Sequence, residues 1–164
     1  MQSEISTYVL LAGLAIALLW VIVTDLKSRT ISNRLTLTVA LGAPLYWLSI
    51  GLPLWPGIGF QIGLALLVFA TCCVLFAIRQ MGGGDVKLLT ALALWVAPLQ
   101  FGQLIVLMAL LGGALTLAFG AWHIMRRRKD RLAIPYGVAI SAAGLWILAA
   151  HYFPAAGRAI GLTA

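Results

Sequence analysis

Long apolar stretches alternate with short polar breaks along the whole chain. A helix needs about 20 apolar residues to cross the hydrocarbon core of a bilayer. Dividing the sequence at its charges, glycines and prolines gives six apolar stretches, at residues 5–24, 35–50, 58–78, 86–97, 101–125 and 132–153. The fourth is short, so we expect it to be tilted, partly buried by its neighbours, or prolonged past Pro98. The pattern predicts an all-α fold, a polytopic membrane protein with about six transmembrane helices, in a single domain over residues 1–164.

Basic residues lie almost entirely on one side of these stretches. Arg158 alone falls on the other side. Ten of the eleven lysines and arginines lie where the first stretch joins the second, the third joins the fourth, and the fifth joins the sixth. These ten are Lys27, Arg29, Arg34, Arg79, Lys87, Arg126, Arg127, Arg128, Lys129 and Arg131. Cytoplasmic loops are enriched in these residues, so these joints are predicted to face the cytoplasm and both termini the other side. The first stretch is predicted to be a retained span, because it lacks the basic n-region of a cleavable signal peptide.

Composition agrees with a membrane location and narrows the partners. Hydrophobic residues make up 63% of the chain and charged residues 9%, against about 25% charged residues in soluble domains. The net charge of +7 lies mainly in short loops, where it sets topology and contacts anionic lipid head groups. We therefore expect the lipid bilayer, and no nucleic acid, as a partner. The tryptophans lie mostly near predicted span ends, as in an aromatic belt: Trp20, Trp47, Trp55, Trp95, Trp122 and Trp146.

Metal and redox chemistry find little support in the sequence. The only cysteines, Cys72 and Cys73, are adjacent in an apolar stretch and form no C-x-x-C motif. We expect them to pack or to face lipid, as small hydrophobes do. His123 and His151 lie at span ends on opposite sides, so they cannot share one metal site. No nucleotide or flavin motif occurs, and we predict no metal and no cofactor.

Only four residues are acidic, and two of them belong to one face of the membrane. Asp25 ends the first stretch and Asp85 precedes the fourth, so counting the crossings places both on the same face in either orientation. Glu4 lies on the opposite face, and Asp130 is a loop acid among five basic residues. Ionisable residues at membrane depth are functional candidates. Asp25 and Asp85 are therefore the candidate site.

Each of these two aspartates also has a structural interpretation. Asp85 follows three glycines that permit a tight bend and close approach of another backbone, and aspartate is a good cap for the helix that follows. Asp25 stands at the C-terminal end of its helix, where the helix dipole opposes a carboxylate, although Lys27 and Arg29 offer an ion pair. If the two carboxylates instead converge, both cannot readily ionise in a low-dielectric site. A shared proton then makes one acid and one base, which can activate water and protonate a leaving amine in peptide hydrolysis.

Three motifs resemble those of a known family. The run Gly82-Gly83-Gly84-Asp85-Val86-Lys87-Leu88-Leu89 resembles the Gly-x-Gly-Asp signature of intramembrane aspartic proteases, in the form found in type IV prepilin peptidases. The family's first aspartate motif, Asp-x(5)-Ile-Pro-Asn, resembles the series Asp25, Arg29, Ile31 and Asn33. Its third motif, a Pro-aromatic-Gly step, resembles Ile134-Pro135-Tyr136-Gly137. The three motifs, their order and the six-span layout cover essentially the whole chain.

The resemblance implies a bacterial inner-membrane peptidase that removes the short basic leader of prepilin-like proteins at the cytoplasmic face. Such leaders are cut next to a glycine, just before a hydrophobic helix. The resemblance further implies that Asp25 and Asp85 are the catalytic pair, that the glycines shape the site, and that the other motif residues support it. These residues are Gly82, Gly83 and Gly84, with Asn33, Pro135 and Gly137.

Two departures from the family pattern, and one lysine, refine this expectation. Ser32 stands where the motif has proline, and serine can cap the helix that follows. The first loop has about ten residues and no cysteine, whereas the long bifunctional members carry paired C-x-x-C motifs there. The chain thus resembles the short peptidase-only form found with Flp-type, tight-adherence pili, for which we do not expect N-methylation of the pilin. Lys87 has two interpretations, as a shaping residue that tunes the acidity of Asp85 or as a side chain that extends to the lipid head groups.

Two other functions stay open at this point. One is a Gly-x-Gly-Asp protease with a different membrane substrate, such as remnant signal peptides. The other is a non-enzymatic assembly or transport component in which the two acids bind a proton or a cation. The sequence leaves open which pilin is cut and which oligomeric state the protein adopts.

Overall fold

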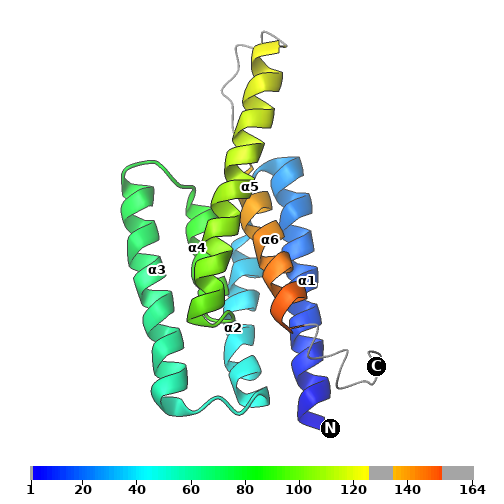
Figure 1. The fold of residues 1–164 in the computed structure, drawn as a ribbon, viewed down its shortest axis with the longest axis vertical. Helices are drawn as coiled ribbons and strands as arrows, with labels where there is room; N and C mark the ends of the chain where they lie inside the picture. Colours follow the sequence, from blue (N-terminus) through cyan, green and yellow to red (C-terminus); the bar gives the residue numbers. More distant parts are fainter. Residues whose placement is uncertain (1, 126–134, 153–164) are drawn as a thin grey trace.

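The part of the chain that the structure describes folds into six α-helices and two short π-helical segments and contains no strand. The computed structural model describes residues 2–125 and 135–152 (Figure 1). The helices are α1 (Gln2–Ser28), α2 (Asn33–Ser49), α3 (Gly59–Ala77), α4 (Gly83–Ala93), α5 (Pro98–Met125) and α6 (Tyr136–Ile147), with η1 (Leu54–Ile58) before α3 and η2 (Leu148–Tyr152) after α6. Each helix corresponds to one predicted stretch, so the prediction of an all-α, polytopic membrane protein is confirmed. Asp130, Arg158 and the basic run at 126–131 lie outside the described residues.

The helices differ in whether they can cross a bilayer alone. Within the described residues, three are long and apolar enough: Glu4–Ser28, Leu54–Ala77 and Pro98–Trp122. Helix α4 has only 11 residues, which is about 16 Å at 1.5 Å per residue, or roughly half of a hydrocarbon core of about 30 Å. The alternative in which the fourth stretch continues past Pro98 is wrong, because α4 ends at Ala93 and Pro98 begins α5.

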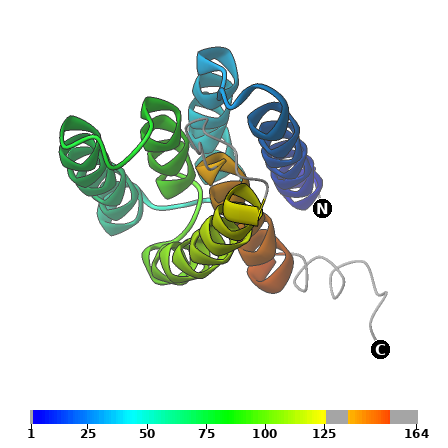
Figure 2. The same ribbon diagram turned by 90° about the horizontal axis from the view of Figure 1, so that it is seen from above.

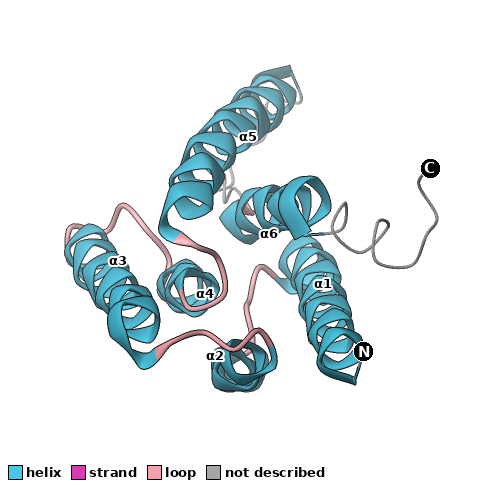
Figure 3. Cartoon of the chain, turned by 60° about the horizontal axis from the view of Figure 1, so that its bottom comes forward, coloured by secondary structure: helices cyan, strands magenta, loops and turns pink. Residues whose placement is uncertain are grey.

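The two shortest helices, α4 and α6, form the centre of the bundle. Helix α4 contacts α2, α3 and α6, and helix α6 contacts α1, α4 and α5. Seen along the bundle, the longer helices surround this pair (Figures 2 and 3). Leu88, Leu89 and Leu92 of α4 are essentially inaccessible to solvent, as is Ile140 of α6. The fourth stretch is therefore short because its neighbours bury it, which is the alternative that the structure supports.

The turn after α4 lies inside the bundle, and side chains of other helices satisfy its carbonyl groups. The last carbonyls of a helix have no partner within the helix, and unpaired backbone groups are costly at membrane depth. Gln61 of α3 donates through Nε2 to the carbonyls of Ala93 at 2.9 Å and Val96 at 2.7 Å. Trp47 of α2 donates through Nε1 to the carbonyl of Leu94 at 2.8 Å. These bonds allow a helix of half the membrane thickness to end in the protein interior.

The tryptophan pattern differs in part from the predicted aromatic belt. Trp20, Trp55, Trp122 and Trp146 are exposed, as residues of a belt would be. Trp47 and Trp95 are buried instead, and Trp95 donates to the carbonyl of Val39 at 2.7 Å. For these two residues the belt prediction is wrong, because their indole N–H groups are used to tie the interior turn to α2.

Candidate active site

Asp25 connects the end of one helix to the beginning of another. It lies in the last turn of α1 and is only 5% exposed. Its Oδ2 accepts a hydrogen bond from the backbone N–H of Val138 at 3.1 Å, and the carboxylate also interacts with the backbone N–H of Gly137. These two N–H groups belong to the first turn of α6, where helical N–H groups lack their usual partners four residues earlier, and Val138 shares its N–H between Asp25 and the carbonyl of Pro135 at 3.2 Å. An N-cap side chain normally binds them, but the N-cap of α6 is Pro135, which makes no such bond.

This contact gives Asp25 a capping role at a second helix, which its place at the C-terminal end of α1 did not predict. The dipole of α1 opposes the carboxylate, as expected, but the positive end of the α6 dipole faces it. The ion-pair interpretation is not supported either. Arg29 is near enough to act on Asp25 electrostatically, but neither Arg29 nor Lys27 forms a salt bridge with it among the described residues. Asp25 is thus held by α6 rather than by the neighbouring cations.

The Pro-aromatic-Gly step provides the space that this contact needs. A Cβ at Gly137 would lie 2.8 Å from Oδ2 and 3.0 Å from Cγ of Asp25, and 2.9 Å from Cδ1 of Ile31. Any side chain at this position would displace the carboxylate or the start of α6. The preceding Tyr136 packs on α5, where a Cβ at Gly112 would lie 3.3 Å from its ring. Pro135 and Gly137, predicted from the motif to support the site, both lie at the helix end that holds Asp25.

Asp85 lies at the start of α4, in a position different from the one predicted. Helix α4 begins at Gly83, not after Asp85, so Asp85 is its third residue and cannot be the N-cap. The N-cap is Gly82, whose backbone N–H donates to the Asp85 carboxylate. An acid at the third position that bonds back to the N-cap N–H is half of a capping box. The structural interpretation therefore holds in this modified form, and it leaves part of the carboxylate accessible because Asp85 is only half-buried.

The three glycines have unequal roles. None of them is among the described glycines with positive φ, and Gly83 and Gly84 are helical, so these two do not form the tight bend that glycines permit. Close approach is confirmed for Gly84, where a Cβ would lie 3.1 Å from Cβ of Ile31. A Cβ at Gly82 would lie 2.9 Å from Oδ2 of Asp85, whereas one at Gly83 would make only ordinary contact. Gly82 and Gly84 are the two glycines that the local packing requires.

Ile31 lies between the two helix ends that carry the aspartates. Its Cβ is next to Gly84 of α4 and its Cδ1 is next to Gly137 of α6. The loop between α1 and α2 thus inserts one side chain that separates the start of α4 from the start of α6. Sequence reasoning assigned no role to Ile31, and its place in the first aspartate motif was the only available signal.

The two carboxylates lie close enough for the charge of Asp25 to act on Asp85. The structure thus brings together the two residues predicted from the count of crossings, at the end of the bundle where α4 and α6 begin. Asp85 also acts on the thiol of Cys72 in α3, which is buried as expected of a packing cysteine. The sequence offered no sign that Cys72 lies within electrostatic reach of Asp85. The catalytic role of the aspartate pair stays a prediction.

Lys87 and Asn33 form a separate polar contact near this end of the bundle. Lys87 Nζ donates to Asn33 Oδ1 at 2.8 Å, and both residues are exposed. Within the described ranges Lys87 forms no salt bridge with Asp85, so it does not act as an ionic partner there. Ser32 stands at the N-cap of α2, as predicted, but its side chain makes no capping bond.

Metal ligands do not gather at this site. Among residues 2–125 and 135–152, apart from the few undescribed side chains, no group of three or more His, Cys, Asp or Glu is placed to hold a metal ion. His151, one of the two histidines weighed above, contacts Gln103 at 2.8 Å. The site presents two neighbouring carboxylates, one fixed by backbone donors and one half-exposed.

Comparison with known proteins links this geometry to one family. Residues 12–120 match the model of the type IV leader peptidase family. The match contains both aspartates and the glycine motif, and it ends before α6. No significant match was found among curated proteins or among solved structures.

Proposed function

We propose that this chain, which belongs to the type IV leader peptidase family, is an aspartic endopeptidase whose catalytic pair is Asp25 and Asp85. Family membership implies peptidase activity. The observation that carries the mechanism is the meeting of two carboxylates at the N-terminal ends of α4 and α6, where the charge of one acts on the other. Two such groups share one proton more readily than they both ionise.

The proposed reaction uses one carboxylate as a base and the other as an acid. The ionised member accepts a proton from water as the water attacks the scissile carbonyl, and the protonated member donates to the leaving amine. Asp25 accepts the hydrogen bond from Val138 through Oδ2, which fixes the position of the carboxylate at the start of α6. Gly137 and Gly84 act through Asp25 and Ile31, so we regard them as positioning residues.

The proposed substrate is a prepilin-like protein of the Flp type, cut at the cytoplasmic face of a bacterial inner membrane. Support for this face comes from the lysines and arginines, ten of which lie at the joints on the side of the aspartates. A basic leader that is retained in the cytoplasm would meet the aspartate pair there. The resemblance of the three motifs to prepilin peptidases supports the substrate class.

Leader removal from a co-expressed small Flp-type prepilin tests the proposal. Wild type is compared with Asp25→Ala, Asp85→Ala and Asp130→Ala in membranes free of any other peptidase of this type, and the product is followed by gel shift and mass spectrometry. We expect the first two variants to lose cleavage and the third to keep it. Cleavage that survives the loss of either Asp25 or Asp85 would rule out the aspartic mechanism, and an inactive wild type would point to another substrate or to the non-enzymatic reading.

A further inference from the structure

A groove of about 370 Å³ opens between α2, α3 and α4, outside the aspartate pair. Its volume lies in the range of about 300–1,000 Å³ that is common for ligand sites. Leu37 of α2, Phe69 of α3, and Ala91 and Leu94 of α4 form its apolar wall. Asn33 and Lys87, joined by their hydrogen bond, lie at the end nearest the start of α4. The groove therefore has one polar, basic mouth and an apolar interior.

We propose that this groove binds one anionic phospholipid, with its phosphate at Lys87 and an acyl chain along the apolar wall. The site is independent of the proposed peptidase chemistry, because neither Asp25 nor Asp85 lines it. Basic pockets between transmembrane helices are known to bind anionic lipid head groups. The shape and the charge of the groove each support this occupant.

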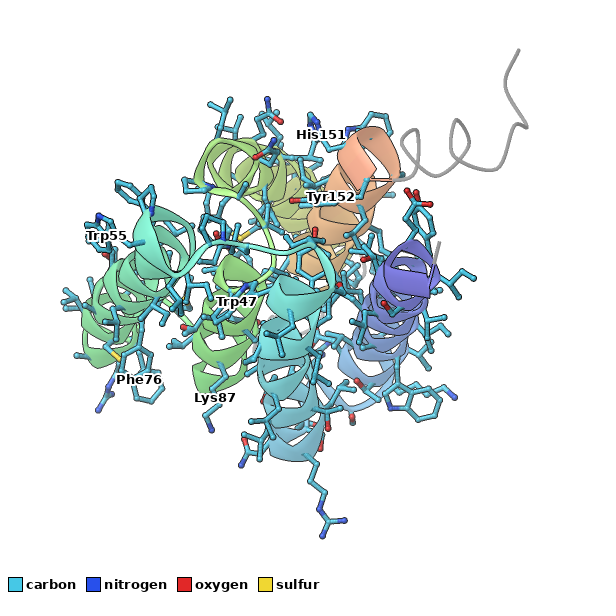
Figure 4. The ribbon with its side chains drawn as sticks, turned by 90° about the horizontal axis from the view of Figure 1, so that it is seen from below. Trp47, Trp55, Phe76, Lys87, His151 and Tyr152 are labelled. Carbon is cyan, nitrogen blue, oxygen red and sulfur yellow. The ribbon has the colours of Figure 1, made fainter. Side chains whose placement is uncertain are left out.

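The mouth has donors available for a phosphate. A lysine ammonium has three N–H donors, and in the described part of the chain Lys87 uses one, toward Asn33, and has no salt bridge. Figure 4 shows Lys87 pointing outward from α4 beside α2. The neighbouring start of α2 adds Arg34, which is exposed. The mouth thus favours an anion and disfavours a basic peptide.

The interior of the groove suits a hydrocarbon chain. Its two threonines, Thr36 and Thr90, use their hydroxyl groups on carbonyls of their own helices, so they leave little polar character to the wall. From Lys87 to Leu94 the wall follows α4 for seven residues, or about 10 Å at 1.5 Å per residue. This depth accommodates the upper part of an acyl chain whose head group stays at the membrane surface.

A second groove shows what the charge contributes. The larger groove between α5 and α6, of about 630 Å³, is lined by apolar residues together with Gln103 and His151, and by no lysine or arginine. It is equally able to take hydrocarbon but offers no fixed cation to a phosphate. Of these two grooves, only the groove of Lys87 is therefore expected to select an anionic head group.

Lipid retention by the full-length protein tests the proposal. The protein is reconstituted in nanodiscs that contain equal amounts of phosphatidylglycerol and phosphatidylcholine, extracted mildly, and examined by native mass spectrometry. Wild type should retain phosphatidylglycerol in preference to phosphatidylcholine, and Lys87→Gln should lower that preference about fivefold, the effect of one basic residue near an anionic surface. Lys27→Gln is the matched control, because Lys27 is exposed and does not line the groove.

A second variant separates the apolar wall from the charge. Ala40→Phe fills the groove from α2 and leaves Lys87 in place, so it should reduce the retention of the bound lipid. Equal retention of the two lipids by wild type, or an unchanged preference in Lys87→Gln, would overturn the proposal. A photoreactive residue at position 37 that cross-links lipid in cells supports it, whereas one that cross-links only a protein identifies a different occupant and refutes it.

Discussion

Replacing Gly137 with alanine should move the carboxylate of Asp25 without removing it, and so tests whether its position matters for catalysis. The added Cβ would lie 2.8 Å from Asp25 Oδ2, and ordinary contact begins near 3.4 Å. The gap must therefore open by about 0.6 Å. A similar lengthening would take the bond from Val138 N–H to Oδ2, now 3.1 Å, beyond the upper limit of about 3.2 Å for such bonds.

The size of the effect follows from what that movement breaks. A hydrogen bond to a charged group contributes about 1.5–3 kcal/mol, and misplacing a catalytic group by about 1 Å can cost roughly 100-fold in rate. We expect Gly137→Ala to lower kcat/KM for leader removal by about 10- to 100-fold while the variant remains folded. The second close contact, with Cδ1 of Ile31, adds to the displacement.

The measurement is the rate of prepilin cleavage by purified enzyme in detergent or nanodiscs, with helical content from circular dichroism and size-exclusion behaviour alongside. Gly113→Ala is the matched control, because nothing lies within 4 Å of a Cβ placed there, and an alanine in a helix interior is tolerated. If Gly137→Ala cleaves at the wild-type rate, the close approach of α6 to Asp25 does not position the catalytic group and this reasoning is wrong.

Three further outcomes are expected. Asp85→Glu should be inactive in the cleavage assay, because the longer side chain displaces the carboxylate, whereas a protein that only needed the negative charge would retain function. Gln61→Leu should lower the free energy of unfolding by about 1–3 kcal/mol in a denaturant titration, since it leaves the carbonyls of Ala93 and Val96 without donors. Thr71→Val, whose hydroxyl bonds only within its own helix, should not do so, and an equal loss in both variants would contradict this explanation. The cleavage rate should pass through a maximum with pH, because the pair needs one proton, and a rate that rises to a plateau would argue against a shared proton.

The sequence predicts the pairing of the aspartates better than it predicts how they are held. Counting the crossings is enough to bring Asp25 and Asp85 to the same end of the bundle, because the helices run alternately up and down. The cap that Asp25 provides to α6 could not be foreseen, since its partner Val138 lies 113 positions away and capping rules are local. The motif marks Gly137 as a supporting residue but does not say that its missing Cβ makes room for a carboxylate.

Local rules also gave the wrong start for α4 and the wrong place for two tryptophans. Glycine has a low helix propensity, which favours a loop at Gly83 and Gly84. Tertiary contact overrides this preference, because Ile31 packs against Gly84. In the sequence, Trp47 and Trp95 cannot be told apart from the exposed tryptophans, because the belt prediction rests only on nearness to predicted span ends. Only the three-dimensional position of the turn after α4 shows that their N–H groups are needed inside.

The short α4 has a consequence for how the protein enters the membrane during synthesis. A helix of 11 residues that carries Asp85 and Lys87 in its first two turns has too little apolar length to leave a translocon for lipid alone. Its exposed end would meet hydrocarbon with unpaired carbonyls until Gln61 and Trp47 reach it. Because α2 and α3 precede α4 in the chain, both donors are already made when α4 emerges. Insertion of α4 into the membrane is therefore expected to depend on α2 and α3. Gln61 would act first during this insertion and later in the folded protein.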